Sequence, residues 1–187
     1  MLESKRLILR NYKESDLEDY WEYVTNPKIG PACGWPSYTD KNLALERLKY
    51  ESTKPNQFAI VYKSDNKVIG SIELMDYNQE RYESIEVVNG AKEIGFLLSK
   101  KYWGKGIMPE ALKLVMEYAF NTLNVPMIVM SHSDANVQSG RVQEKLGFKI
   151  VGRKDNYRKW LDGKMSNCII RKMTKEEYNK ANNELEN

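Results

Sequence analysis

One stretch, residues 93–111, restricts the possible folds of this chain more than any other part of the sequence. It begins with a short apolar run up to Leu98 that has one charge at its start, which predicts a buried strand. Gly104 and Gly106 follow, and because neither has a Cβ, the backbone there can adopt positive φ and approach a ligand closely. Pro109 then fits the first position of a helix. Such a helix directs its unpaired N–H groups and positive dipole end at the turn, which suits a phosphate.

The glycine pair alone does not identify a class of protein. No Gly-Lys-Ser/Thr follows at the spacing of a Walker loop, and Pro109 stands where the dinucleotide fingerprint needs its third glycine. A plain strand-to-helix turn, with glycines for packing, is the alternative.

A second stretch decides between these interpretations. It runs Asn136-Val-Gln-Ser-Gly-Arg-Val-Gln-Glu-Lys-Leu-Gly-Phe148 and follows an apolar strand predicted at residues 127–130. Together the two stretches resemble the GNAT superfamily of acetyl-coenzyme A-dependent N-acetyltransferases, whose pyrophosphate loop reads Gln/Arg-x-x-Gly-x-Gly/Ala. Here the loop is Lys101-Tyr-Trp-Gly-Lys-Gly106, with lysine at its first position. The residues in and around both stretches resemble those of the family branch that acetylates the N-termini of ribosomal proteins.

The resemblance is strongest over residues 93–152 and extends over residues 6–173. It implies an α+β fold: a mixed, mostly antiparallel sheet flanked by helices, with two splayed central strands. It also implies an enzyme that transfers acetyl from acetyl-CoA to a primary amine through a tetrahedral intermediate, with no metal. The gap between the splayed strands leaves backbone groups for the pantetheine arm to pair with, like an added strand.

The family pattern assigns coenzyme A to three groups of residues. The backbone of the central strand would pair with pantetheine, the loop N–H groups would hold the pyrophosphate, and the second stretch would contact pantetheine and the sulfur. These predicted residues are Phe96, Leu97, Leu98, Trp103, Gly104, Lys105, Gly106, Ile107, Met108, Asn136 and Ser139. Capping of the following helix is an alternative role for Asn136 and Ser139.

Glu93 is the predicted catalytic base, because some GNAT enzymes place a glutamate at this position and burial should raise its pKa. A structural ion pair at the strand end, or a relayed water, is the alternative. His132, the only histidine, is a weaker candidate. Many relatives have a thiolate-protonating tyrosine where this chain has Gln143, so the acid would be Ser139, water or nothing. A module that binds acyl-CoA for regulation without catalysis therefore stays an alternative.

Trp35 and Tyr38 lie in a predicted loop, residues 29–38, that contains two prolines and two glycines. They either cap the core or form a wall of the acceptor pocket, as the resemblance implies for this region. The acceptor itself, a protein N-terminus or a small amine, is not identified by the sequence.

Composition supports a single domain over residues 1–187, with a core over about 6–173 and a polar tail at 179–187. No apolar run reaches membrane-spanning length and no signal core follows the N-terminus, so a cytoplasmic protein is expected. A net charge of +3 is too small to predict nucleic acid as a partner. Two distant cysteines are expected to be reduced thiols. The oligomeric state, monomer or homodimer, stays open.

Hydrophobic periodicity predicts the remaining elements. The expected helices are residues 40–52, 109–122, 136–146 and a helix after a Ser15–Glu18 capping box, plus a short helix after a Thr174–Glu177 box. The expected strands are residues 6–10, 58–62, 68–75, 93–98, 127–130, 150–158 and 164–173. The acidic segment 76–92 would either contact substrate or lengthen a hairpin.

Overall fold

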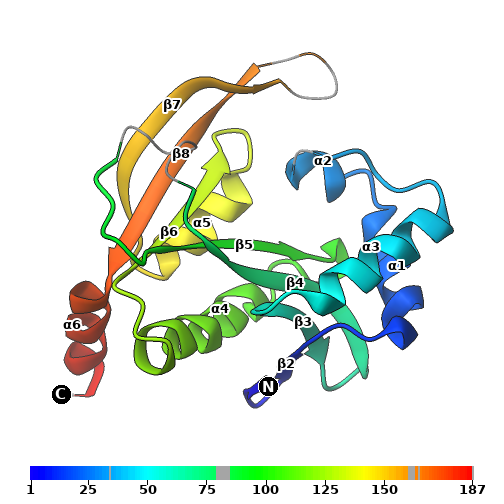
Figure 1. The fold of residues 1–187 in the computed structure, drawn as a ribbon, viewed down its shortest axis with the longest axis horizontal. Helices are drawn as coiled ribbons and strands as arrows, with labels where there is room; N and C mark the ends of the chain where they lie inside the picture. Colours follow the sequence, from blue (N-terminus) through cyan, green and yellow to red (C-terminus); the bar gives the residue numbers. More distant parts are fainter. Residues whose placement is uncertain (34, 79–84, 160–162, 164, 187) are drawn as a thin grey trace. The chain divides into compact units, whose positions relative to one another are not determined.

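The computed structural model describes residues 1–33, 35–78, 85–159, 163 and 165–186 (Figure 1). Within them the chain forms two compact units. The first contains Met1–Glu73, Phe96–Val115 and residue 163, and the second contains the other described residues of the chain. The single-domain organisation stays a prediction.

Four strands of the first unit pair in an antiparallel order, β1-β2-β3-β4. Their bounds are Leu2–Glu3, Leu7–Arg10, Gln57–Tyr62 and Lys67–Asp76, the last of which continues into the second unit. The hairpin of β3 and β4 confirms the predicted pair of strands. The two-residue strand β1 was not predicted, because so short a segment has no periodicity to read.

Helices α1 (Leu17–Val24) and α3 (Lys41–Thr53) pack on the core of the first unit. Figure 1 shows the two helices side by side, and their apolar faces contribute Tyr20, Tyr23 and Leu48 to that core. The prediction of a Ser15–Glu18 capping box is wrong. Asp16 makes the cap instead, because its carboxylate accepts from the Lys13 N–H at 2.8 Å.

The predicted loop at residues 29–38 contains a short helix, α2 (Gly30–Cys33), which corrects the expectation of irregular structure throughout. Pro31 does not prevent it, because proline is tolerated in the first turn of a helix, where N–H groups have no intrahelical partner. An added Cβ at Gly30 would lie 2.6 Å from the Trp35 ring, so this glycine lets the ring pack on the backbone.

Helix α4 (Ile107–Glu117) follows the glycine loop and ends in a π-helical turn, Tyr118–Thr122. It begins two residues before Pro109, so the prediction that Pro109 takes the first helical position is wrong. The proline is tolerated at the third position for the same reason as at the first, because none of the first four N–H groups has an intrahelical acceptor.

The second unit has the strand order β5-β6-β8-β7, in which β5 and β6 are parallel and the other pairs antiparallel. The bounds are Lys92–Leu98 for β5, whose last three residues belong to the first unit, Met127–Ser133 for β6, Lys149–Lys159 for β7 and Met165–Thr174 for β8. Figure 1 shows β7 and β8 as a long ribbon. This arrangement confirms the predicted α+β class with a mixed, mostly antiparallel sheet. The predicted turn of the last hairpin lies largely outside the described residues.

Helix α5 (Val137–Lys145) lies against β6 and ends before Gly147, whose φ of 85° marks the predicted glycine stop. Helix α6 (Lys175–Glu186) begins at the predicted capping box: the Thr174 N–H donates to Glu177 Oε2 at 3.0 Å. Helix α6 is longer than the predicted short helix and runs through most of the predicted tail to Glu186, and the fraying of this tail stays a prediction. Tyr178 stacks on Phe120 with 4.6 Å between ring centroids, which fixes the first turn of this helix.

The acidic segment 76–92 is only partly described. Residues 79–84 lie outside the described residues, so both interpretations of this segment stay predictions. Ile85 and Ala91 pack with Met127 and Val129 in the core of the second unit. Among the described residues, no helix is long and apolar enough to cross a membrane.

Candidate active site

The glycine loop of the first unit has the conformation that the sequence predicts. Gly104 and Gly106 have φ of 75° and 70°, the left-handed region that favours glycine. An added Cβ at Gly104 would meet no atom within 4 Å. The loop backbone is therefore open on the side of Gly104, and a ligand can approach it there.

A clamp from the N-terminal segment holds the downstream side of this loop. Arg6 Nε donates to Glu110 Oε2 at 2.7 Å, and Arg6 Nη1 donates to the Lys105 carbonyl oxygen at 3.1 Å. Ser4 Oγ donates to the other oxygen of Glu110 at 2.6 Å. Burial opposes ionisation of Glu110, but the hydrogen bonds from Arg6 and Ser4 outweigh it and lower its pKa. One arginine thus ties the loop backbone to the first turn of α4.

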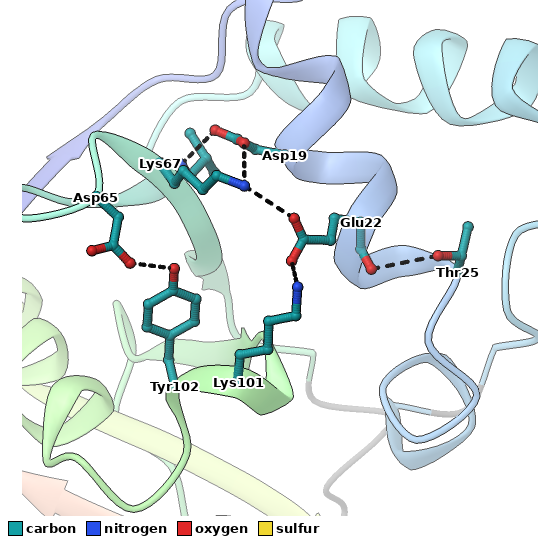
Figure 2. Close-up of polar contacts among 8 residues, drawn as sticks. Asp19, Glu22, Thr25, Asp65, Lys67, Lys101 and Tyr102 are labelled. Atoms are coloured by element: carbon teal, nitrogen blue, oxygen red, sulfur yellow. Dashed lines mark hydrogen bonds and ion pairs between the residues drawn. The ribbon is translucent and has the colours of Figure 1, made fainter.

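Carboxylates hold the upstream side of the loop (Figure 2). Tyr102 donates to Asp65 Oδ2 at 2.6 Å, and Lys101 forms an ion pair with Glu22, which also accepts from Lys67 at 3.1 Å. Lys101 first, and then Lys67, lower the pKa of Glu22. The lysine that opens the family loop motif is therefore bound to a carboxylate of α1, which fixes the turn before Gly104.

Two contacts within the first unit show which residues of β5 turn their backbone groups toward β4. The Ser99 N–H donates to the Ile69 carbonyl at 2.7 Å, and an added Cβ at Gly70 would lie 2.4 Å from the Leu97 carbonyl oxygen. The backbone groups of Leu97 therefore face β4. Because backbone groups alternate along a strand, those of Phe96 and Leu98 face the opposite edge.

The other predicted ligand residues of the first unit are also placed. Trp103 Nε1 donates to the Leu98 carbonyl at 2.8 Å, which leaves its ring 37% exposed beside the loop. The Lys105 ammonium lies 5.1 Å from the centroid of the Tyr102 ring. Ile107 and Met108 are buried, so they can offer a ligand only their backbone N–H groups.

Trp35 and Tyr38 pack against the core cluster of the first unit, with 5.6 Å between their ring centroids in an edge-to-face geometry. The Tyr38 N–H donates to the Val24 carbonyl at 3.2 Å, which ties this segment to the end of α1. Both side chains are only half-buried, so they cap the core and still present part of each ring to solvent.

In the second unit, Glu93 is 5% exposed and pairs in register with Val129. The described ladder between β5 and β6 in this unit covers only Lys92 and Glu93. Burial first, and then the charge of Glu93, raise the pKa of Tyr77, which places this phenol near the carboxylate. Glu93 is therefore a buried carboxylate on β5 beside β6.

A polar network links α5 to the end of β6. Gln143 is fully buried, and its Nε2 donates to Ser139 Oγ at 3.1 Å and to the Ser131 carbonyl at 3.5 Å. Its Oε1 lies 3.2 Å from His132 Nδ1. Asn136 Oδ1 accepts from the Ser139 N–H at 3.2 Å, so the capping role predicted as an alternative for Asn136 is confirmed.

We expect His132 to titrate below its usual value of 6.5. Burial lowers the pKa of the imidazole and the Arg171 charge lowers it further, against the opposing hydrogen bond with Gln143 and the charge of Asp134. Because the unfolded chain then binds the proton more readily, stability should fall as the pH drops through about 6.5. NMR of this single histidine, with unfolding measured from pH 8 to 5, checks both results; a midpoint above 6.5 contradicts them.

The sequence analysis predicted neither the Arg6 clamp nor the Gln143 network. Only the Gln143 network has a feature in the sequence that could have indicated it. Gly140 lies inside α5, where a glycine is unfavourable by about 1 kcal/mol relative to alanine. An added Cβ there would lie 2.6 Å from His132 Nε2, so the glycine permits a close approach of helix and imidazole. Nothing in the sequence connects Arg6 with Glu110, more than one hundred positions later.

Comparison with known proteins gives a family match. The model of the acetyltransferase (GNAT) domain matches residues 6–149. An uncharacterized N-acetyltransferase, p20 of Bacillus licheniformis, is 26% identical over 182 residues, covering 95% of this chain and 97% of that protein.

Solved structures share the fold. An acetyltransferase of the GNAT family from Bacillus anthracis superposes with a TM-score of 0.79 at 21% identity, covering 94% of this chain and 99% of that one. The ribosomal-protein-S5-alanine acetyltransferase of Vibrio fischeri gives 0.70 at 22% identity, covering 94% and 97%. A spermidine N-acetyltransferase of Vibrio cholerae, solved with CoA and spermine, gives 0.76 at 18% identity, covering 94% and 99%.

Proposed function

Because the chain belongs to the GNAT acetyltransferase family, we propose that it transfers the acetyl group of acetyl-CoA to a primary amine. The observation that supports this most is the glycine loop. Its two left-handed glycines are fixed on one side by Arg6 and on the other by Glu22 and Asp65. A loop held in this way needs little ordering when a diphosphate binds, which favours affinity.

The loop has the donors that a diphosphate requires. In this proposal the N–H groups from Trp103 to Met108 bind the pyrophosphate, and the open face at Gly104 gives its oxygens room. The backbone groups of Phe96 and Leu98 face away from β4, so in this proposal they bind the pantetheine amides. Leu98 contributes its N–H group, because its carbonyl oxygen already accepts from Trp103 Nε1. Leu97 contributes its side chain, because its backbone faces β4.

The reaction needs a neutral amine and a stabilised leaving group. The amine nitrogen attacks the thioester carbonyl carbon, the C–S bond then breaks, and the sulfur leaves with the electron pair. Glu93, directly or through a water, accepts the proton that the nitrogen loses. Backbone N–H groups of the central strand stabilise the oxyanion of the tetrahedral intermediate. Asn136 and Ser139 bind near the pantetheine and the sulfur.

The acceptor class stays a primary amine. Structural neighbours named for an alanine of ribosomal protein S5 and for spermidine share the fold at 22% and 18% identity, so they define a panel of test amines rather than a substrate. The half-exposed faces of Trp35 and Tyr38 would form an apolar wall beside the methylene groups or peptide of the acceptor.

Thiol release from acetyl-CoA, followed with spermidine, spermine and a peptide that begins with alanine, tests the proposal. We expect amine-dependent release together with an acetylated product of 42 Da added mass, about the mass of C₂H₂O that acetylation adds. CoA binding without turnover on any amine of the panel would favour the acyl-CoA-binding regulatory module instead.

A further inference from the structure

The strongest unassigned feature is the buried amide of Gln143, which stands where many relatives have the acidic tyrosine. The donor and acceptor groups around this amide fix which way its nitrogen and oxygen point. The Ser131 carbonyl can only accept, so the amide nitrogen must face it, at 3.5 Å. The amide oxygen then faces His132 Nδ1 at 3.2 Å, which requires the imidazole to donate from Nδ1.

This orientation sets the role of the Ser139 hydroxyl. Gln143 Nε2 donates to Ser139 Oγ at 3.1 Å, so the serine oxygen is an acceptor toward the helix interior. Its own hydrogen must then point elsewhere, and among the described residues the hydroxyl has no hydrogen-bond acceptor for it. The hydroxyl is half-buried at the start of α5, where the positive end of the helix dipole also favours a nearby anion.

The close approach of α5 to His132 makes this arrangement possible. An added Cβ at Gly140 would lie 2.6 Å from Nε2 and 3.3 Å from two ring carbons. Any side chain there would push the ring away and break its contact with Gln143, one turn later. Gly140, His132 and Gln143 therefore act as one unit that sets the direction of the Ser139 O–H.

We propose that Gln143, held by His132, is a positioning residue that aims the Ser139 hydroxyl as a hydrogen-bond donor to the departing sulfur of coenzyme A. This rests on the proposed function. The C–S bond breaks, the sulfur takes the electron pair, and Ser139 keeps its proton while it stabilises the thiolate. The thiolate is protonated later by solvent. The Ser139 hydroxyl, oriented by the buried amide, is thus a neutral hydrogen-bond donor in place of an acid. Such a donor suits a leaving group as weakly basic as a thiolate.

A double-mutant cycle tests the proposal. Ser139→Ala, Gln143→Met and the double variant are compared for kcat with acetyl-CoA and the best acceptor of the panel. Each single change should lower kcat about 10- to 100-fold, the value of one hydrogen bond to a charged group. The double variant should be no slower than Ser139→Ala alone, because Gln143 acts only through the serine. Ser139→Thr keeps the hydroxyl and should retain most of the rate.

Matched controls separate positioning from stability. Gln138→Met changes an exposed glutamine of the same helix and should leave kcat unchanged. The affinity for CoA, measured by calorimetry, should stay within about 2-fold of wild type in Gln143→Met and Gln138→Met, since neither glutamine is among the residues proposed to bind coenzyme A. If Gln143→Met does not fold, Gly140→Ala replaces it in the same cycle, because the methyl group displaces His132 without altering either partner.

The outcomes are distinct. Losses that multiply in the double variant, or a wild-type kcat in Gln143→Met, would overturn the positioning role while leaving the acetyltransferase proposal intact. A wild-type chain that transfers acetyl to no amine of the panel would overturn the proposed function, and this inference with it.

Discussion

A Gly104→Asp variant should lose affinity for CoA by at least about 30-fold. The added carboxylate would stand on the open face of the loop, where the proposal places the diphosphate. Two unit charges about 4 Å apart repel by about 4 kcal/mol at the effective dielectric of a protein surface, and every 1.4 kcal/mol is about tenfold in affinity. Solvent exposure and salt reduce this repulsion, so a loss of about 30-fold in CoA affinity is the smallest effect that we expect. Calorimetric titration with CoA measures it.

Gly104→Asn is the matched control, because aspartate and asparagine tolerate the left-handed conformation about equally well. The asparagine variant should lose less than about 10-fold, and the gap between the two variants should narrow as salt is raised. Gly90→Asp adds the same charge at another left-handed glycine, with φ of 86°, and should leave CoA affinity unchanged. Equal losses for Asp and Asn at position 104 would mean that no anion binds at this face.

Replacing Glu93 with glutamine is expected to lower kcat by about 100-fold or more at neutral pH, the usual contribution of a general base. Glutamine keeps the size and the polar end of the side chain but cannot accept the proton. The residual rate should rise with pH toward the pKa of the amine, because the neutral amine becomes more abundant without help. Thiol release measured from pH 6 to 10 gives both values.

The control for this variant is Glu144→Gln, which removes an exposed carboxylate from α5 and should leave the pH–rate profile unchanged. CoA affinity of Glu93→Gln should equal that of wild type, since the base is not a ligand of the pyrophosphate. Turnover of Glu93→Gln equal to wild type would remove Glu93 from the role of base and leave the task to water or to the free amine.

The parts of the site that the sequence predicts are those with local causes. Gly104 and Gly106 have positive φ because only glycine adopts that conformation without strain, and both lie in the loop between the end of β5 and the start of α4. Asn136 caps α5 because a side-chain acceptor at that place satisfies an unpaired N–H group. Both results depend on neighbours in the chain, so a motif is enough to find them.

The parts that the sequence does not predict depend on distant residues. The clamp on the loop needs Arg6, which directly precedes β2, and Glu110 on α4, and the turn before the loop needs Glu22 on α1. The extent of α6 is another case, because its polar composition predicts a short helix while the stacking of Tyr178 on Phe120 stabilises it. Tertiary packing overrides local preference at such places.

Amide hydrogen exchange with and without CoA tests the central claim most directly, because it reports on the loop itself. The account predicts that CoA slows exchange of the N–H groups from Gly104 to Met108 and of Phe96 and Leu98, while the N–H groups of β7 and β8 are unaffected. Exchange that stays unchanged at the glycine loop while CoA protects some other segment would contradict it.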